Sequence, residues 1–573
     1  MTIPCHTLQA DDESLPGLIR NILSRRGIAG GQLRRDFLHP RLANLPSPFL
    51  MQDMEQAVAL VLQARERGSH IVVYGDYDVD GTCAAVLLVN FFRHHMGMSA
   101  EIHQPHRLRQ GYGLHQDDLR QLARSAGHRP LLVTVDCGIS AVAEVALARE
   151  LGFAVLVTDH HELPTTLPAA DAILNPRRQD CSFPDKDIAG VGVAFFFLMA
   201  LRTRLAQAGC FAAQGMPNLK KELELVALGT VADVVPLTGV NRILVKGGVE
   251  VMAGRPRAGV AALLKKARMD DGMIGGRDIA FRLAPRLNAA SRMGKVELAR
   301  DLLSTDNDSE AWRIAAQLET VNSERQELTA QILAAALEQS RRSVGEHNSS
   351  RTVWGPWHPG VVGIVAAKLA EEHNCPAVVL CEDDTLLKGS VRSARGVNIH
   401  HALEQCRELL LRFGGHAAAG GLTLEASKAE AFAERFDLAV RAQIQYAEDK
   451  EKNTTEDDIS LPGLLGAELV QPGFLHQYLL LEPFGCGNPE PIFVLDGVQP
   501  TGVRIFGRTR QHLGFSFLWH GVRVDGIAFN MAHWAPRISD GSVVTLRCTV
   551  RQQNTAGQER TLAIHAKDIN IAT

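Results

Sequence analysis

The chain has 573 residues, with 60 Lys and Arg against 64 Asp and Glu and a formal net charge of −4 at pH 7. That length predicts about three or four domains, at roughly 100–200 residues each. A hydrophobic content of 46% and a charged content of 22% exclude the disordered and fibrous classes. No apolar run approaches about 18 residues, and the N-terminal segment lacks the pattern of a secretory signal. The scattered cysteines include no CxxC pair, which argues against a zinc ribbon or a disulfide framework. We therefore expect a cytoplasmic protein without a membrane span.

Short apolar runs alternate with helical patterns through the first half of the chain. Residues 71–74, 131–135 and 154–158 are apolar at successive positions, as in strands that are buried on both faces of a parallel sheet. An aspartate follows each run. Because ligands bind at the carboxyl ends of the strands in open α/β sheets, these acids predict one site at one edge of the sheet.

The second half begins with a long helical segment. Residues 306–342 contain no Pro or Gly, and their apolar residues recur at helical spacing, which predicts one helix that connects two lobes. A second α/β pattern includes a strand-like run at 376–380. The last segment is rich in β-type residues with frequent Gly and Asn, which predicts a small antiparallel barrel, with oligonucleotide binding as one option. Phe515, Phe517 and Trp519 alternate along one barrel strand; we expect them to fill the core, with base stacking as the alternative.

The sequence thus predicts an α/β protein of two lobes with parallel-type sheets, joined by a long helix and followed by a β-barrel. The expected segments are an N-terminal extension (1–50), a first lobe (51–305), a connecting helix (306–346), a second lobe (347–446), a charged linker (447–462) and the barrel (463–573).

Three carboxylates follow the first strand at alternate positions, Asp76, Asp78 and Asp80. They would repel one another unless a cation neutralised them, and an extended backbone would point all three to one side. Oxygen ligands suit Mg²⁺ or Mn²⁺. A calcium loop of the EF-hand type is excluded, because position 12 counted from Asp76 is Leu87 instead of Glu. A solvated acidic loop is the alternative interpretation.

Further candidate ligands follow the other strands. Asp136 comes after the second run, and Asp159, His160 and His161 come after the third. An imidazole can bind a metal, and a neighbouring carboxylate such as Asp159 can orient it. Asp233 lies within an otherwise apolar segment, where a buried unpaired carboxylate is costly, so a metal or a basic partner is expected there.

These carboxylates and imidazoles exceed what one cation needs. Two cations about 3.5–4 Å apart, bridged by one Asp, would use them all and would stabilise both the attacking and the leaving oxygen of an in-line phosphoryl displacement. No GxxxxGK[ST] phosphate loop occurs, so ATP-driven work is not expected. The residues themselves therefore predict hydrolysis of a phosphoester.

Taken together, these motifs resemble the DHH phosphoesterase superfamily and, within it, the RecJ family of single-strand-specific 5′→3′ DNA exonucleases. The similar segments run from about residue 53 to the end of the chain, namely 76–81, 105–113, 135–138, 159–161, 229–233, 286–292, 357–366, 389–393, 414–421 and 483–491. Ser291 departs from the family pattern, which usually has Gly there. The resemblance implies a DHH catalytic domain, a DHH-associated (DHHA1) domain and a nucleic-acid-binding barrel of the OB-fold type.

The resemblance also implies how the site is used. Two Mn²⁺ or Mg²⁺ ions are expected, bridged by Asp136 and bound by residues from the set Asp76, Asp78, Asp80, Asp136, His160 and Asp233. Within that set Asp78 would hold one ion, and Asp80, His160 and Asp233 the other. Asp76 would either bind an ion directly or lie behind the ligands as a supporting acid. His161, next to Asp159, would contact the scissile phosphate. The expected substrate contacts are Arg107, Tyr112, Arg286, Arg292, Ser390, Arg392 and His416; an ordinary ion pair for Arg392 and a satisfied buried histidine for His416 are the alternatives.

The implied function is release of 5′-mononucleotides from single-stranded DNA in DNA repair and recombination. The expected partner is a single-strand-binding protein, and a monomer is the expected state. Two other classes stay open. Superfamily enzymes for small substrates, such as nanoRNases, cyclic-dinucleotide phosphodiesterases and pyrophosphatases, need only the two lobes. A non-catalytic DNA-binding scaffold, like the eukaryotic replication factor descended from this superfamily, would have lost metal ligands that are all present here. The residues alone decide neither polarity nor the choices of Mn²⁺ or Mg²⁺ and DNA or RNA.

Overall fold

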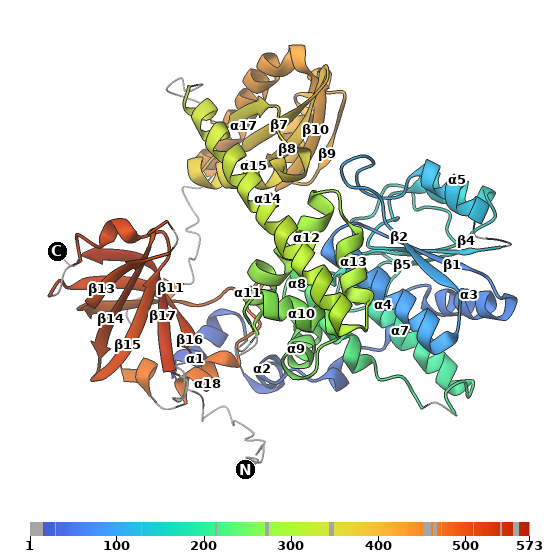
Figure 1. The fold of residues 1–573 in the computed structure, drawn as a ribbon, viewed down its shortest axis with the longest axis horizontal. Helices are drawn as coiled ribbons and strands as arrows, with labels where there is room; N and C mark the ends of the chain where they lie inside the picture. The colour runs from blue at the N-terminus through green and yellow to red at the C-terminus, as the bar shows by residue number, and fades with distance from the viewer. Residues whose placement is uncertain are drawn as a thin grey trace.

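The computed structural model (Figure 1) contains three sheets, one in each lobe and one near the C-terminus. It describes residues 15–571 except 16, 29, 126, 128, 213–214, 270–273, 343–348, 451–459, 462–466, 472, 508, 539–540 and 554–560. No helix in this part of the chain has the length and apolar character needed to cross a bilayer. All of its cysteines are unpaired.

The first lobe is built on a five-stranded parallel sheet of order β2-β1-β3-β4-β5. The strands are β1 (Ile71–Gly75), β2 (Ala100–His103), β3 (Leu131–Val135), β4 (Ala154–Thr158) and β5 (Ala172–Leu174). Both faces are covered: Ile71 and Val73 of β1 pack in one apolar cluster, and Val72 and Tyr74 pack in another. This arrangement confirms the three predicted strands and brings their carboxyl ends to one edge.

Helices surround this sheet and extend it into a helical subdomain. The helices are α3 (Met54–Arg67), α4 (Val79–Met96), α5 (Gln116–Ser125), α6 (Val142–Glu150), α7 (Gly190–Gln207), α8 (Leu223–Ala232), α9 (Gly239–Gly254), α10 (Ala258–Lys266), α11 (Gly276–Asp278), the π-helical turn η4 (Ile279–Leu283), α12 (Ala284–Arg292) and α13 (Glu297–Ser304).

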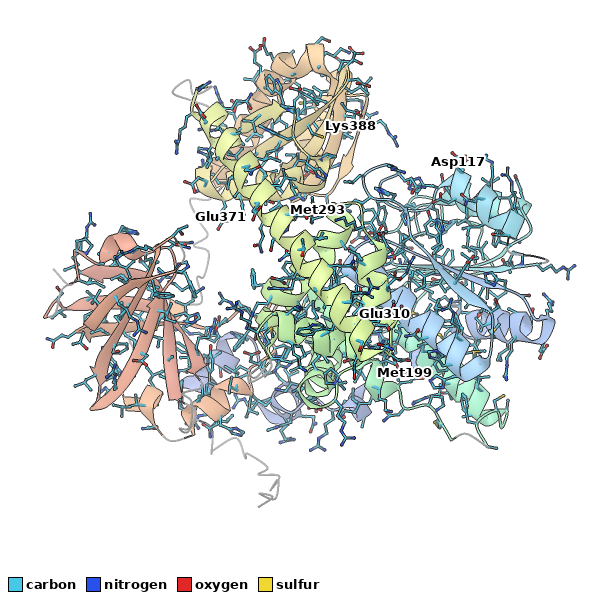
Figure 2. The ribbon with its side chains drawn as sticks, in the orientation of Figure 1. Asp117, Met199, Met293, Glu310, Glu371 and Lys388 are labelled. Atoms are coloured by element: carbon cyan, nitrogen blue, oxygen red, sulfur yellow. The ribbon has the colours of Figure 1, made fainter. Side chains whose placement is uncertain are left out.

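One 35-residue helix, α14 (Asp308–Arg342), joins the lobes and confirms the predicted connector. Its first half buries Ile314 and Leu318 in the core of the first lobe, and its second half buries Ile332 and Ala336 in the core of the second. A continuous helix that is anchored in two cores holds the lobes at a fixed distance (Figure 1). In Figure 2, Asp117 on α5 and Met199 on α7 mark the first lobe, and Lys388 marks the second.

The second lobe has a mixed sheet of order β6-β7-β8-β10-β9. Its elements are β6 (Arg351–Gly355), α15 (Pro359–His373), β7 (Ala377–Asp383), β8 (Leu386–Arg392), α16 (Ile399–Glu404), β9 (Arg412–Gly415), β10 (Ala419–Glu425) and α17 (Ala429–Lys450). Only β6 and β7 run parallel, so the expected parallel-type sheet is wrong for this lobe. The reason is the short turns, such as Asp384–Thr385 between β7 and β8, which can join only antiparallel neighbours.

The C-terminal sheet has the order β11-β12-β16-β17-β15-β14-β13. Its elements are β11 (Ser460–Leu461), α18 (Phe474–Leu479), β12 (Ile492–Val498), β13 (Thr501–Phe506), β14 (His512–Trp519), β15 (Val522–Ala528), β16 (Val544–Gln553) and β17 (Thr561–Ile571). Phe515 and Phe517 are buried in its core, as expected for core-filling residues. Ile19 and Ile22 of the first helix, α1 (Gly17–Arg25), pack in the same core. The N-terminal segment, which includes α2 (Gly31–Leu38), therefore belongs structurally with the C-terminal sheet.

A buried arginine ties the C-terminal part to the first lobe. Arg242 on α9 donates to the carbonyl oxygens of Phe37 at 2.8 Å, Leu480 at 2.9 Å and Leu481 at 3.1 Å. Its guanidinium also lies 3.8 Å from the centre of the Phe37 ring. Burial lowers the pKa of Arg242 to about 9. Three chain segments that are distant in sequence thus meet at one side chain, which fixes where the C-terminal sheet stands relative to the first lobe.

Candidate metal centre

The centre is built on the carboxyl edge of the first sheet. Asp76, Asp136 and Asp159 each follow a strand, and each continues the ladder: their amides donate to Val135 at 3.3 Å, Thr158 at 3.1 Å and Leu174 at 3.0 Å. Asp136 also adopts a left-handed backbone conformation with φ 59°. The edge of the sheet therefore places the three carboxylates in one row, as the sequence predicted.

Asp78 and Asp80 also lie beside these carboxylates, but the backbone that carries them turns into a helix and does not stay extended as expected. The sequence interpretation assumed an extended backbone, but α4 begins here and Asp78 is its N-cap, accepting a hydrogen bond from the Gly81 amide at 3.0 Å. Asp80 lies in the first turn and accepts bonds from the amides of Gly190 at 2.6 Å and Val191 at 3.0 Å, at the start of α7. Aspartate is favoured at these positions because helix N-termini carry unpaired amides and positive partial charge.

His160 joins the carboxylates from the end of β4. Its Nε2 lies 3.1 Å from Asp136 Oδ1, 3.5 Å from Asp233 Oδ2 and 4.0 Å from Asp80 Oδ2. Two sets of candidate ligand atoms result, each within 4.8 Å: Asp80, His160 and Asp233 form one, and Asp76, Asp78 and Asp136 form the other. A third set of the same kind combines Asp136 and His160 with His161. Asp136 thus stands between the sets, where a shared ligand would be.

The electrostatics of these groups fit divalent cations. Burial, followed by repulsion from neighbouring carboxylates, raises the pKa of Asp76 and Asp136 and raises those of Asp80 to about 7 and Asp233 to about 9. One oxygen each of Asp76, Asp136 and Asp233, and Nε2 of His160, are buried without a hydrogen-bond partner among the described residues. Burial also lowers the pKa of His160 to about 4, which keeps the imidazole neutral. Buried, convergent oxygens with one neutral nitrogen are donors suited to Mn²⁺ or Mg²⁺.

His161 differs from its neighbour His160 because its ring is hydrogen-bonded to Asp159. Its Nδ1 lies 2.7 Å from Asp159 Oδ1, and the other oxygen of Asp159 accepts from the Ile139 amide at 2.9 Å. Burial alone would lower the pKa of His161, but the hydrogen bond and charge of Asp159 raise it to about 9. The hydroxyl of Tyr112 lies 3.3 Å from the same Nδ1. A positively charged imidazolium therefore stands beside the ligand atoms.

Three arginines from separate elements gather beside this centre. Arg107 follows β2 and lies over the Tyr77 ring at 4.7 Å; Arg292 ends α12 and donates to the Gly360 carbonyl at 3.2 Å; Arg392 comes from β8 of the second lobe. Burial and then the charges of neighbouring arginines lower the pKa of Arg292 to about 9, and burial lowers that of Arg392. Within the described residues, none of the three guanidinium groups pairs with a carboxylate. This arginine group (Arg107, Arg292 and Arg392) is suited to an anion.

Known proteins share this organisation. Residues 70–230 match the family model for the DHH family, N-terminal domain, residues 352–442 that for the DHHA1 domain, and residues 463–568 that for the RecJ OB domain. The chain is 38% identical over 534 residues to the single-stranded-DNA-specific exonuclease RecJ of Dickeya dadantii, covering 91% of this chain and 90% of that protein.

The chain belongs to the RecJ family.

Solved structures of this family have the same fold. The crystal structure of RecJ from Thermus thermophilus in complex with Mn²⁺ superposes with a TM-score of 0.76 at 29% identity, over 97% of this chain and 76% of that chain. The corresponding complex with Mg²⁺ gives a TM-score of 0.71 over 97% and 74%. The two-lobed α/β fold with a long connecting helix and a C-terminal OB domain is thereby confirmed.

Of the three remaining predicted substrate contacts, one lies beside the arginine group and two make no contact with the centre in the residues that the structure describes. Ser390 lies with Arg392 against Gly363 of α15, so it belongs beside the arginine group. Arg286 instead pairs with Glu319 of α14, with Nε 2.7 Å from a carboxylate oxygen. His416 is exposed in the turn between β9 and β10, where its amide donates to Ala419. Within the described part of the chain, no hydrogen bond or ion pair joins Arg286 or His416 to the centre.

Gly190 is a functional position that sequence reasoning missed. A Cβ atom there would lie 2.8 Å from the Cβ of Asp136 and 3.0 Å from Oδ2 of Asp80. Only glycine therefore lets α7 begin directly against two candidate ligands and donate its first amide to Asp80. The available signal was the glycine at the start of the apolar run 190–201.

Proposed function

We propose that this chain is a single-stranded-DNA-specific exonuclease that works in the 5′→3′ direction and releases 5′-mononucleotides with two Mn²⁺ or Mg²⁺ ions. The observation that carries this proposal is the pair of largely buried ligand sets, linked where His160 Nε2 lies 3.1 Å from Asp136 Oδ1, beside three arginines that pair with no described carboxylate. The name of the Dickeya relative supports single-stranded DNA as substrate, and the Thermus complexes support Mn²⁺ and Mg²⁺.

Each of the two ligand sets would hold one ion. Asp76, Asp78 and Asp136 would hold one, and Asp80, His160 and Asp233 the other. When bound, such ions act as Lewis acids toward the attacking and leaving oxygens of a phosphodiester. The amides of α7 keep Asp80 oriented, and burial keeps His160 unprotonated at the nitrogen that faces the carboxylates.

His161 would act on the phosphate itself. Its Nδ1 is engaged by Asp159, so Nε2 is the atom left to donate a hydrogen bond to a phosphate oxygen. Because Asp159 keeps the ring positively charged, this bond would be charge-assisted and would strengthen as negative charge develops. Tyr112, edge-on to the His161 ring at 5.6 Å, restricts its rotation.

The arginine group would receive the end of the strand. Arg107, Arg292 and Arg392 repel one another until an anion lies among them, and a terminal phosphate carries more charge than an internal phosphodiester. Recognition of an end favours an exonuclease over an endonuclease, with Ser390 as a further hydrogen-bond partner. Arg286 and His416 remain predicted contacts whose place would depend on the bound strand.

The setting of the reaction is also part of the proposal. We infer a cytoplasmic monomer that acts in DNA repair and recombination together with a single-strand-binding protein, as the resemblance implies. The working domain boundaries are an N-terminal extension (1–50), the DHH domain (51–305), the connecting helix (306–346), the DHHA1 domain (347–446), the linker (447–462) and the OB domain (463–573). Helix α17 extends to Lys450, into the first residues of that linker, and most of the remainder lies outside the described residues.

The two alternatives fit the molecule less well. Enzymes for small phosphoesters need only the two lobes, whereas residues 463–568 match an OB domain whose core includes α1. A scaffold without activity would not need seven candidate ligands in contact, and the structure brings all of them together.

A digestion experiment tests the proposal. Single-stranded DNA labelled at its 5′ end in one reaction and at its 3′ end in another is incubated with the protein and Mn²⁺, beside a dinucleotide, a matched duplex and an EDTA control. We expect early release of the 5′-labelled mononucleotide, an intact duplex and no cutting in EDTA. Bound but uncut single strands would replace the proposal with the scaffold, and cleavage of dinucleotides alone would replace it with a small-substrate enzyme.

A further inference from the structure

The loop between β2 and α5 carries two of the residues expected to contact the substrate, Arg107 and Tyr112. Residues 104–115 form turns and bends without a helix or strand. Gly111 and Gly113 flank Tyr112 in left-handed conformations, with φ 89° and 88°. A loop that lacks a backbone ladder depends on its side chains for a fixed position. The contacts of those side chains therefore decide where Arg107 and Tyr112 lie.

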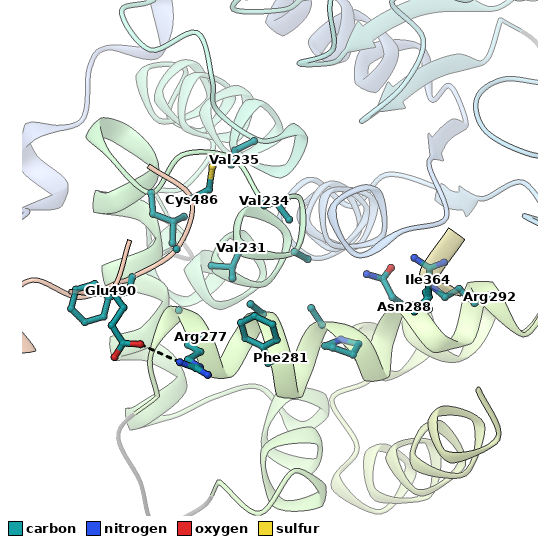
Figure 3. A pocket seen from close by; sticks show the side chains of 18 of the residues that line it. Val231, Val234, Val235, Arg277, Phe281, Asn288, Arg292, Ile364, Cys486 and Glu490 are labelled. Carbon is teal, nitrogen blue, oxygen red and sulfur yellow. Dashed lines mark hydrogen bonds and ion pairs between the residues drawn. The ribbon is translucent and has the colours of Figure 1, made fainter. Parts of the chain in front are cut away.

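Arg107 is the one member of the arginine group that lies on an irregular loop. Burial, followed by the charge of Arg107, lowers the pKa of Arg292 to about 9 and also lowers that of Arg392. Arg292 is fixed at the junction of the lobes, where it lines a cavity with Ile364 of α15 (Figure 3) and donates to the Gly360 carbonyl at 3.2 Å. Repulsion would therefore move Arg107 and its loop unless other contacts held them.

Asp118 lies behind this loop, in the first turn of α5. It is only 8% exposed, and a buried carboxylate needs hydrogen-bond donors. Its Oδ2 accepts from the Tyr74 hydroxyl at 2.9 Å and lies 3.1 Å from His103 Nε2, at paired positions of β1 and β2. Its Oδ1 accepts from Gln110 Nε2 at 2.7 Å. One buried acid thus joins the edge of the sheet to the loop.

Gln110 connects this acid to the turn that contains Arg107. Its Oε1 accepts from the His106 amide at 2.6 Å, and its own backbone amide donates to the His106 carbonyl at 2.8 Å. Both polar atoms of the side chain are thereby used, one toward Asp118 and one toward the loop. Although Gln110 lies at the surface, these bonds fix the orientation of the turn relative to α5.

Tyr74 connects the same acid to the neighbourhood of Tyr112. Its hydroxyl lies 3.3 Å from the Gly113 carbonyl oxygen, in addition to its bond with Asp118. Burial, followed by the charge of Asp118, raises the pKa of Tyr74, so the hydroxyl keeps the proton that it donates. The Tyr112 hydroxyl in turn lies 3.3 Å from His161 Nδ1. The buried acid is therefore linked to the residue that lies against the charged histidine.

We propose that Asp118 is a positioning residue, which holds the loop 104–115 so that Arg107 meets the terminal phosphate of a single strand. In the described part of the chain, its hydrogen bonds and ion pairs go only to the three residues named above, so it acts through the loop and not on the ions. Fixing Arg107 beside two like charges prepares the site before the strand arrives, which lowers the cost of binding. The inference rests on the proposed function for its substrate and adds the residue that sets the place of this contact.

The test compares two single strands that differ only in a 5′-phosphate or a 5′-hydroxyl end. The ratio kcat/KM is measured for both strands with Mn²⁺, for the wild type and for Asp118→Ala. The variant should lose about 10- to 150-fold on the phosphorylated strand, the effect of one charged hydrogen bond, and clearly less on the hydroxyl strand. The loss should appear mainly in KM, since the metal ligands are untouched. In a double-mutant cycle, Asp118→Ala should add little to Arg107→Ala, because both changes remove the same contact.

Three variants make the result specific. Asp118→Asn should behave as the wild type, because its oxygen can accept from Gln110 while its nitrogen donates to the Tyr74 hydroxyl. Gln110→Met cuts the link to the loop but leaves Asp118 bonded to Tyr74, so it should give the same difference between strands to a smaller extent, even if Asp118→Ala folds poorly. Asp117→Ala removes the neighbouring acid of the same turn (Figure 2), whose side chain is 97% exposed. It should change kcat/KM for neither strand.

The outcomes separate this inference from the exonuclease. Equal losses on both strands in Asp118→Ala and Gln110→Met, or a full further loss on top of Arg107→Ala, would overturn the assignment. Wild-type protein that cuts both strands with equal kcat/KM would also overturn it and leave the exonuclease standing. Binding of the same strands in EDTA, followed by anisotropy, does not depend on cutting. A wild type that binds the phosphorylated end more tightly and loses this preference in Asp118→Ala, but does not cut with Mn²⁺, would refute the exonuclease and leave Asp118 as the positioning residue.

Discussion

The charge of His161 is the feature whose removal gives the most specific prediction. Asp159 raises the pKa of His161 from 6.5 to about 9 against the opposing effect of burial. That change corresponds to about 3 kcal/mol in favour of the imidazolium, at about 1.4 kcal/mol per pH unit. At pH 7.5 the protonated form then exceeds the neutral form by about 30 to 1.

Asp159→Asn keeps the shape of the side chain and removes its charge. Burial would then be opposed only by the charges of Asp233 and Asp78, so the pKa of His161 should fall from about 9 and the share of protonated rings at pH 7.5 should fall with it. If the imidazolium donates to the phosphate, the rate at pH 7.5 should fall at least about tenfold, and up to about 10⁴-fold where orientation is also lost. Because the protonated form is the active one, activity is lost as pH rises through the pKa of His161. The alkaline limb of the pH–rate profile should therefore move to lower pH in the variant.

The assay is the initial rate of mononucleotide release from single-stranded DNA between pH 5.5 and 9.5, at saturating Mn²⁺. Bound cations lower the pKa of His161 in both proteins, so the comparison between them is the measurement. His161→Gln lacks the titrating ring and should lose this limb altogether, while Mn²⁺ binding followed by electron paramagnetic resonance should be retained. Identical pH profiles for Asp159→Asn and wild type would refute the role assigned to the Asp159–His161 pair.

Three other changes test the remaining parts of the argument. Asp136→Ala should abolish hydrolysis while single-strand binding, measured by anisotropy, largely survives; wild-type turnover would disprove its position between two ions. In the metal-free protein, the pKa values of Asp80 (about 7) and Asp233 (about 9) are raised, so the folded state loses stability as pH rises from about 4 through 9. Mn²⁺ should therefore raise the Tm more at pH 8 than at pH 6. An equal increase in Tm at both pH values would contradict the electrostatic account. Arg242→Met deprives three carbonyl oxygens of a charged donor, offset in part by the removal of a desolvated charge. It should cost about 1–4 kcal/mol, seen as a lower Tm and faster proteolytic release of the C-terminal part; unchanged proteolysis would mean that the contact does not hold the barrel.

The sequence predicted three strands of the first sheet and the long helix that joins the lobes. The runs at 71–74, 131–135 and 154–158 became β1, β3 and β4, and the helix predicted from residue 306 became α14. Apolar strands and an uninterrupted helical period are local signals, so they can be read without knowing the tertiary structure. The mixed sheet of the second lobe was missed because strand direction depends on how short the connecting turns are, which apolar periodicity does not reveal.

The sequence predicted the site residues that lie at strand ends. It did not predict the contacts that form between segments distant in sequence. Asp76, Asp136 and Asp159 follow strands, and the rule for parallel sheets brings them together. Nothing near residue 80 in the sequence indicates that the amides of Gly190 and Val191 would bind its carboxylate. The ion pair of Arg286 with Glu319 is equally invisible, because it depends on how α12 packs on α14.

The division of charge between the lobes has a consequence for control of the reaction. Every candidate metal ligand named above belongs to the first lobe, whereas the arginine group takes Arg392 from the second. A change in the angle between the lobes would leave the metal sets intact but would separate Arg392 from Arg107 and Arg292. At Gly360 the second lobe comes so close to the first that a Cβ would lie 1.9 Å from the carbonyl oxygen of Arg292. Under the proposed function, the metals could therefore be bound before the strand, and the junction between the lobes would determine whether a terminal phosphate is held beside them.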